Sequence, residues 1–562
     1  MQPVLEIKNL HIGFLQNGVV QPVAEDISFS LNRGETTALV GESGSGKSVT
    51  ALSILRLLPK ESVVSGQMFY ATENAEPLNL LASDSKLIRS LRGNKIAMIF
   101  QEPMTSLNPV YTCGYQVMKV LRQHKKLTGK VARQQTIELF NLVELPDPAS
   151  MVDRYPHQIS GGQKQRVMIA MAMSCEPDIL IADEPTTALD VRVQANILSL
   201  LARLQKKTGM AILFITHDLG LVADFAHKVA VLYKGKIIEE GLTKEVLKYP
   251  QHLYTKALLA CRPATGAKGE RLALLSDFLQ DSTVGRGVKG PPPPLESGTA
   301  VLCVKNLVVQ FPIKTNFLGT PTSFFKAVDN VSFEVSKNEI VGLVGESGCG
   351  KTTLGRTLLQ LVKQSSGEIF LNGKDLTHLT PAQLRQERKD LQIIFQDPYG
   401  SLNPRLSIGN AISEALKVHG LASTKKQQQE RVVSMLEKVN MQADHFNRYP
   451  HQFSGGQRQR ICIARALALD PSFLVFDESV SALDVSVQAQ VLNLINNLRQ
   501  SLDFTAIFIS HDLSVVHYLS DRIMVMQKGK IVENGPAHQV YHHPQSDYTR
   551  KLIEAIPGKS LV

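Results

Sequence analysis

Two copies of a glycine-rich motif contain the residue types that bind phosphate groups. GESGSGKS occupies residues 41–48 and GESGCGKT occupies residues 345–352. Each copy follows a short β-prone run and opens a stretch with helical apolar spacing, which predicts a strand–loop–helix unit. In such a loop, backbone N–H groups turn toward anionic oxygens, the lysine reaches the β- and γ-phosphates, and the last hydroxyl binds Mg²⁺. The predicted nucleotide-binding residues are Gly41, Ser43, Gly44, Ser45, Gly46, Lys47 and Ser48, and then Gly345, Ser347, Gly348, Cys349, Gly350, Lys351 and Thr352.

Two acidic residues end a buried apolar run in each half of the chain, at residues 178–184 and 472–478. In open α/β sheets, ligands bind at the carboxyl ends of the strands, so these acids should lie near the phosphate loops. A lone strand-end acid pair is usually only solvated, but a phosphate loop in each half disfavours that interpretation. The aspartates are suited to holding Mg²⁺ and the glutamates to activating water as general bases. The candidate metal ligands are Asp183 and Asp477, and the candidate bases are Glu184 and Glu478.

A histidine ends a further apolar strand in each half. His217 follows the run 211–216, and His511 follows the corresponding run in the second half. A single histidine is most often structural. Two histidines 294 residues apart, in register with the strand-end acids, suggest a contact to the γ-phosphate.

These elements recur in the same order because the chain is an internal duplication. The offset between equivalent motifs stays between 294 and 304 residues, which indicates two copies of a whole domain pair rather than a solenoid. The predicted domains are 1–263 and 301–562, each with its own carboxyl-terminal tract. Residues 264–300 contain four consecutive prolines and several glycines, which predicts a linker that buries little apolar surface, with a short helix over 272–279.

The composition is that of an ordinary globular protein. The chain has 562 residues, 43% apolar and 20% charged, with a formal net charge of +10; at roughly 150 residues per domain this predicts about four domains. No apolar run approaches the roughly 20 residues of a membrane helix, and the first ten residues lack the pattern of a secretory signal. Six scattered cysteines without a CxxC pair disfavour disulfides and zinc fingers. The expected compartment is the cytosol.

Together these motifs resemble those of ATP-binding cassette (ABC) ATPases. ISGGQ at 159–163 and FSGGQ at 453–457 are similar to the signature motif of that family. The resemblance assigns nucleotide contacts to Ser160, Gly161, Gly162 and Gln163, and to Ser454, Gly455, Gly456 and Gln457. Gln101 and Gln396 match the glutamine loop, which implies roles in catalysis and at the metal ion. Asp190 and Asp484 match the D-loop, and Phe14 and Phe311 match the aromatic residue that stacks on adenine, although both could equally be core residues.

The resemblance implies an α/β fold with two tandem phosphate-loop ATPase domains. Each domain would have a RecA-like core with a mainly parallel sheet, a small antiparallel β-part and a helical subdomain, the first of which falls between Gln101 and Asp178. In the family two cassettes pack head to tail, so two composite sites would bind ATP and Mg²⁺, with metal ligands Ser48, Thr352, Asp183, Asp477, Gln101 and Gln396.

A finer resemblance concerns the transported solute. IFQEPMTSLNP at 99–109 and RYPHQISGGQKQR at 154–166, with their second copies and the carboxyl-terminal tracts, look like the oligopeptide, dipeptide and nickel importer subfamily. The chain also resembles fused two-cassette subunits such as those of microcin C/peptide and glutathione importers. The implied partners are two integral-membrane permeases and an extracytoplasmic solute-binding protein, with one copy of this chain per transporter, peripheral at the cytoplasmic face of the inner membrane. No nucleic-acid partner is expected, and the solute stays open.

The rival interpretation is a twin-cassette ATPase that acts on ribosomes or nucleic acid. Such proteins use a long, charged helical linker, whereas this linker is rich in proline and glycine. Within the favoured interpretation one departure stands out: Pro185 follows the first candidate base, but Ser479 follows the second. Loss of the proline frees φ at that position and could loosen the placement of Glu478. The hypothesis is that both sites hydrolyse ATP, with the second the more doubtful.

Overall fold

The computed structural model describes residues 3–71, 76–101, 106–186, 189–265, 269–279, 300–315 and 321–561. The chain forms two compact units. The first unit comprises Met1–Leu259, Phe278–Gln280 and Pro557–Val562, and the second comprises Ala260–Asp277 and Asp281–Ile556.

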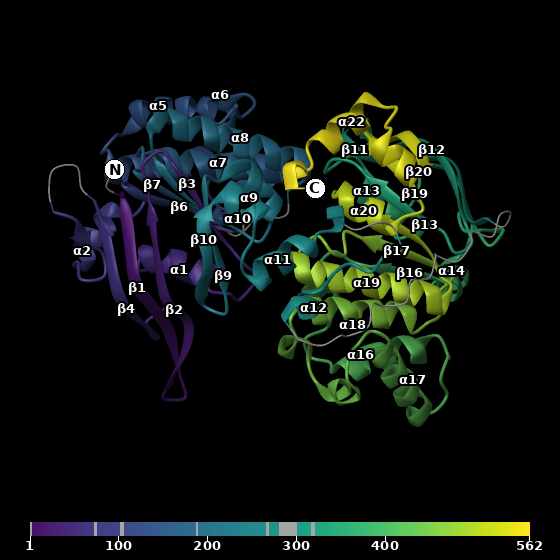
Figure 1. Cartoon of the computed structure of the whole chain (residues 1–562). Coiled ribbons are helices and arrows are strands. Elements are labelled where there is room, and N and C mark those ends of the chain that lie inside the picture. Colours follow the sequence, from purple (N-terminus) through teal and green to yellow (C-terminus); the bar gives the residue numbers. More distant parts are fainter. Residues whose placement is uncertain are drawn as a thin grey trace. The chain divides into compact units, whose positions relative to one another are not determined.

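A six-stranded sheet forms the core of the first unit, in the order β10-β9-β3-β8-β7-β6 (Figure 1). All neighbours pair in parallel except the edge pair β9 and β10. Strands β3, β7 and β8 are buried along their whole length, as expected of a parallel sheet covered on both faces. The strands are β3 (Thr36–Val40), β6 (Ile96–Ile99), β7 (Ile179–Asp183), β8 (Ala211–Thr216), β9 (Lys228–Tyr233) and β10 (Lys236–Leu242).

A smaller antiparallel sheet, in the order β2-β1-β4-β5, packs into the same core. Its strands are β1 (Leu5–Gln16), β2 (Val19–Leu31), β4 (Ser62–Tyr70) and β5 (Leu78–Asn79). The helices of the first half are α1 (Lys47–Ile54), α2 (Ser85–Leu91), α4 (Cys113–His124), α5 (Gly129–Leu142), α6 (Pro148–Met151), η1 (Pro156–Gln158), α7 (Gly161–Met173), α8 (Val191–Thr208), α9 (Leu219–Phe225), α10 (Thr243–Lys248) and α11 (Leu253–Ala260). Helices α4 to α7 form the predicted helical part between Gln101 and Asp178.

The second unit repeats this plan. Its larger sheet has the order β16-β17-β18-β13-β19-β20 and its antiparallel sheet the order β12-β11-β14-β15. The strands are β11 (Ala300–Thr315), β12 (Pro321–Ser336), β13 (Ile340–Val344), β14 (Ser366–Leu371), β15 (Lys374–Asp375), β16 (Leu391–Ile394), β17 (Phe473–Asp477), β18 (Thr505–Ile509), β19 (Arg522–Gln527) and β20 (Lys530–Pro536). The fold class predicted from the sequence is confirmed.

The helices of the second half follow in the same sequence order as those of the first. They are α13 (Lys351–Leu358), α14 (Pro381–Glu387), α15 (Pro398–Ser401), α16 (Ile408–Val418), α17 (Lys425–Lys438), η3 (Ala443–Asn447), η4 (Pro450–Gln452), α18 (Gly455–Leu467), α19 (Val485–Leu502), α20 (Leu513–Leu519), α21 (Ala537–His542), α22 (Asp547–Glu554) and η5 (Lys559–Leu561). Among the helices of the described residues, none combines the length and apolar character needed to span a bilayer.

The described part of the segment that joins the two halves contains two short helices. These are η2 (Pro263–Thr265) and α12 (Leu275–Leu279), the latter within the predicted range. Leu272 is 2% exposed in the core of the second unit, and its N–H and C=O both pair with the side-chain amide of Asn493 at 2.9 Å. The expectation that this segment buries little apolar surface was therefore wrong at Leu272, because a side chain more than 200 residues away satisfies its backbone in a buried place. The four prolines lie outside the described residues.

Candidate functional site

The first phosphate loop joins β3 to α1 as predicted, and its lysine folds back over it. Lys47 is 5% exposed, and its Nζ donates to the carbonyl oxygens of Gly41 and Glu42, both at 2.8 Å. Gly41 has φ of 152°, and a Cβ there would lie 2.2 Å from the carbonyl oxygen of Leu232. Only glycine fits this position, so the loop backbone passes directly against strand β9.

The second loop, between β13 and α13, repeats this geometry. Lys351 Nζ donates to the carbonyl oxygens of Gly345 and Glu346 at 2.7 and 3.0 Å, and a Cβ on Gly345 would lie 2.2 Å from the carbonyl oxygen of Met526. Cys349 is buried in the loop, and this burial raises the pKa of its thiol. The structure therefore places it as a small packing residue, with its thiol protonated at neutral pH.

Each loop hydroxyl lies beside the aspartate predicted to share a metal ion with it. Ser48 Oγ donates to Asp183 Oδ1 at 3.1 Å, and Thr352 Oγ1 donates to Asp477 Oδ1 at 3.1 Å. Both aspartates are 4% exposed. Burial raises the pKa of Asp183 to about 6, against the hydrogen bond from Ser48, and burial also raises the pKa of Asp477. Neighbouring hydroxyl and carboxylate oxygens are the donor set that Mg²⁺ prefers.

The raised pKa of Asp183 gives a stability prediction. Unfolding restores the ordinary pKa of 3.8. The free energy of unfolding therefore falls as the pH rises from about 4 to 6, because the buried carboxyl group must ionise in the folded protein. Above that range the loss of stability is complete, at about 3 kcal/mol. Asp183→Asn, which can still accept from Ser48, should therefore raise the melting temperature of the nucleotide-free protein at pH 8. The gain should shrink as the pH falls toward 4, as calorimetry across this range would reveal. A melting temperature unchanged at pH 8 would contradict the prediction.

The first candidate base is held by a side chain on each oxygen. Gln101 Nε2 donates to Glu184 Oε2 at 3.0 Å, and His217 Nδ1 lies 3.2 Å from Glu184 Oε1. Glu184 comes directly after β7 and is 8% exposed. The strand-end acid, the glutamine loop and the histidine, predicted from separate motifs, therefore meet at one carboxylate.

The second candidate base has the same two kinds of partner, but both lie at one oxygen. Gln396 Nε2 donates to Glu478 Oε2 at 3.1 Å, and His511 Nδ1 lies 3.5 Å from the same oxygen. Burial raises the pKa of Glu478, but the hydrogen bond and charge of His511, with the charge of Lys351, outweigh burial and leave its pKa lowered. The carboxylate is therefore ionised at neutral pH, the form in which a general base accepts a proton.

The missing proline leaves the backbone at the second base unchanged. Glu184 and Glu478 both adopt a left-handed conformation, with φ of 45° and 49°. In the second unit Ser481 N and Oγ both donate to the carbonyl oxygen of Glu478, at 3.3 and 2.8 Å. These bonds restrain the turn that follows Glu478, and the looser placement expected from the sequence stays a prediction.

The signature residues form the amino-terminal ends of two helices. Ser160 caps α7 and Ser454 caps α18, each by accepting from the N–H of the glutamine three residues later, while that glutamine, Gln163 or Gln457, accepts from the serine N–H. Ser160 and Ser454 are exposed, so these helix ends can receive an anion from outside. The D-loop aspartates also lie at helix starts: Asp190 accepts from Val193 N to cap α8, and Asp484 precedes α19.

The predicted adenine contacts lie on the antiparallel sheets. Phe14 is half-buried on β1, and Phe311 is 40% exposed on β11. An exposed ring is compatible with stacking on a base, but the adenine role of both residues stays a prediction.

Sequence reasoning missed a second partner of each phosphate loop. Tyr254 on α11 accepts, through its phenol oxygen, a hydrogen bond from Glu42 N at 3.0 Å. Tyr548 on α22 does the same for Glu346 N at 3.1 Å. The two tyrosines are 294 residues apart, the same offset as the bases and histidines, and both lie in the carboxyl-terminal tracts. These were signals in the sequence, but neither places the tyrosine beside the phosphate loop.

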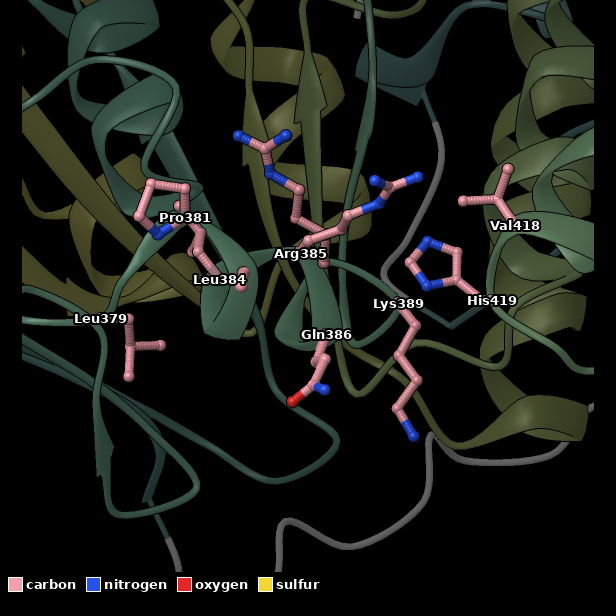
Figure 2. A pocket seen from close by; sticks show the side chains of 10 residues that line it. Leu379, Pro381, Leu384, Arg385, Gln386, Lys389, Val418 and His419 are labelled. Carbon is pink, nitrogen blue, oxygen red and sulfur yellow. The ribbon is translucent and has the colours of Figure 1, made fainter.

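A separate cavity of about 1090 Å³ in the second unit contains none of the predicted site residues. Figure 2 shows Leu379, Pro381 and Leu384 on one side of it and Val418 and His419 on the other. Its basic lining residues are Arg385, Arg388, Lys389 and His419.

Comparison with known families matches both halves of the chain. The model described as ABC transporter matches residues 24–187 and 328–481. Glutathione import ATP-binding proteins of Pectobacterium atrosepticum and Escherichia coli K12 are 46% and 47% identical to this chain, over 99% of it and 89% of their own length.

The chain belongs to the ABC transporter family.

Within that family it is an ATP-binding protein of the oligopeptide/dipeptide importer group. A model described as oligopeptide/dipeptide transporter, C-terminal region, matches residues 238–280 and 532–559. These two carboxyl-terminal tracts include Tyr254 and Tyr548. This ABC protein is accordingly an ATPase that energises an importer. The relatives offer no support for the rival ATPase acting on ribosomes or nucleic acid.

Solved ABC structures match one cassette at a time. The cbiO1 subunit of a Clostridium perfringens ABC transporter has 24% identity and a TM-score of 0.38, over 44% of this chain and 92% of that one. The ATP-binding cassette MJ0796 bound to ADP and Pi has 24% identity and a TM-score of 0.38, over 42% of this chain and 98% of that one.

Proposed function

We propose that this ABC ATPase drives the import of glutathione or other small peptides by hydrolysing ATP in both cassettes. The observation that carries the two-site proposal is that a glutamine and a histidine contact the carboxylate of the candidate base in each unit. The solute class is supported by the names of relatives that are 46–47% identical over nearly the whole chain.

The chain's own residues would divide the chemistry in each cassette. Lys47 and Lys351, with the N–H groups of their loops, bind the β- and γ-phosphates. Glu184 and Glu478 accept a proton from the attacking water, and the glutamines and histidines that contact them fix the direction of the carboxylate. Such fixed geometry lowers the cost of reaching the transition state.

The loop hydroxyls and strand-end aspartates fit a magnesium ion. Ser48 with Asp183, and Thr352 with Asp477, each bring two oxygen atoms within 3.1 Å of one another. Together with Gln101 and Gln396 they would hold Mg²⁺, which neutralises charge on the β- and γ-phosphates during transfer.

The proposed partners are two integral-membrane permeases and an extracytoplasmic binding protein, with this chain peripheral at the cytoplasmic face of the inner membrane. The test is to purify the tagged full chain from detergent-solubilised membranes and reconstitute the complex in proteoliposomes. We expect two permeases to co-purify, and ATPase activity to rise when the binding protein is supplied with glutathione or a dipeptide. Co-purification of ribosomal proteins in place of permeases would contradict the proposal. Stimulation by a nickel chelate but by neither peptide would overturn the solute class alone.

A further inference from the structure

The carboxyl-terminal tract of each cassette contacts the phosphate loop of the same unit. The phenol oxygen of Tyr254 accepts from the N–H of Glu42, the second residue of the first loop, and Tyr548 repeats this at Glu346. Tyr254 is fully buried and Tyr548 is 7% exposed. A buried phenol normally requires a hydrogen-bond partner, and here that partner is the loop backbone itself.

The helix that presents each tyrosine is fixed at its amino-terminal end by a carboxylate. Glu239 on β10 accepts from Gln251 N at 2.7 Å and from His252 N at 3.2 Å, immediately before α11. A negative charge at a helix start also interacts favourably with the helix dipole. Tyr254 therefore lies on a helix whose amino-terminal end is attached to strand β10.

The second tract has the same attachment. Glu533 on β20 accepts from Gln545 N at 2.8 Å and from Ser546 N at 3.1 Å, immediately before α22. Tyr548 follows two residues later, as Tyr254 follows His252. Both units therefore contain the same series of contacts, from the strand to the helix and from the helix to the phosphate loop.

The loop is held on its other side by the turn between strands. Gly235 N donates to the carbonyl oxygen of Ser45 at 3.1 Å, and Gly529 N donates to that of Cys349 at 2.9 Å. With the tyrosine on Glu42 N or Glu346 N, each loop is restrained near both its start and its middle. Restraint before binding reduces the entropy that a ligand must remove when it orders the loop.

The hydroxyl contact recurs even where the packing of the ring differs. The centroids of the Tyr254 and Tyr233 rings lie 4.3 Å apart. In the second unit the residue that corresponds to Tyr233 is Gln527, which has no ring. A purely space-filling role would need only the ring. Both units share the hydrogen bond that the loop N–H donates to the phenol oxygen.

We propose that Tyr254 and Tyr548 are positioning residues for nucleotide binding, through which the carboxyl-terminal tracts hold the phosphate loops in their binding conformation. They touch the loop backbone rather than the reacting atoms. Their loss should therefore weaken nucleotide binding more than it slows hydrolysis of bound ATP.

The test compares Tyr254→Phe, Tyr548→Phe and the double variant with wild type in the full chain. Removing one hydrogen bond of this kind corresponds to roughly a 3- to 10-fold change in an equilibrium. We expect the double variant to raise the KM for ATP by about that factor while kcat changes less than about twofold. The rise in melting temperature caused by added ADP should shrink in parallel. Tyr249→Phe, in the same tract but at a residue 64% exposed, is the matched control and should behave as wild type.

Two outcomes would overturn the proposal. One is a double variant with the wild-type KM and the wild-type response to ADP. The other is a variant with a lower melting temperature but unchanged KM, which would make the tyrosines core residues only. If the double variant does not fold, Glu239→Gln and Glu533→Gln weaken the helix attachment without removing a tyrosine. They should then raise KM by a smaller factor, and an unchanged KM in both would refute the coupling.

Discussion

The double variant Glu184→Gln/Glu478→Gln is expected to hydrolyse ATP about 10²- to 10⁴-fold more slowly than wild type. Glutamine keeps the size of glutamate, and its carbonyl oxygen can still accept from Gln101 or Gln396. It cannot accept a proton from the attacking water at neutral pH. Steady-state phosphate release should therefore collapse while ATP binding persists, as an equilibrium binding assay would verify.

The single variants decide whether both sites work. If the two sites hydrolyse independently, Glu184→Gln and Glu478→Gln should each retain about half of the activity, and less if the sites depend on one another. Full activity in Glu478→Gln would contradict two-site hydrolysis. Glu176→Gln makes the same charge change at a side chain that is 72% exposed, and we expect it to leave activity unchanged.

The sequence predicted the site well where the chemistry is local or repeated. The phosphate loops depend on a few consecutive residues, and the strand-end acids and histidines follow apolar runs of strand length. Because the chain is duplicated, each motif occurs twice, which supports its assignment. The hydrogen bonds from Gln101 to Glu184 and from Gln396 to Glu478 join residues that were already assigned to the same site.

The sequence was less informative where a contact depends on tertiary packing. Nothing local marks Leu272 for burial, because Asn493, which satisfies its backbone, lies more than 200 residues away. Tyr254 likewise sits in a tract that a motif identifies but does not place beside Glu42. Whether Ser479 loosens the placement of Glu478 stays a prediction, and the bonds from Ser481 to Glu478 O are contacts that no proline rule includes. The head-to-tail pairing of the cassettes stays a prediction.

The strand that leads into each phosphate loop is anchored at its start in two chemically different ways. In the first unit Thr36 N donates to His227 Nδ1 at 3.1 Å, and the hydroxyl of Thr36 pairs with the Gln205 amide. In the second unit Ile340 replaces the threonine, and Ile340 N donates to Asp521 Oδ2 at 2.9 Å. Asp521 is paired with Arg499 at 2.6 Å, with side chains 8% and 4% exposed. Arg499 also donates to Asn338 O at 2.6 Å.

Arg499→Ala should therefore destabilise the second unit by about 3–5 kcal/mol, because it leaves the Asp521 carboxylate buried without its counter-charge. Gln205→Ala, the equivalent change in the first unit, removes only neutral bonds and should cost about 1 kcal/mol. Urea unfolding followed by circular dichroism measures both. The triple change Arg499→Gln/Asp521→His/Ile340→Thr copies the neutral anchor and should recover much of the loss seen in Arg499→Ala. A free energy of unfolding for Arg499→Ala within about 1 kcal/mol of wild type would show that the ion pair does not anchor this strand.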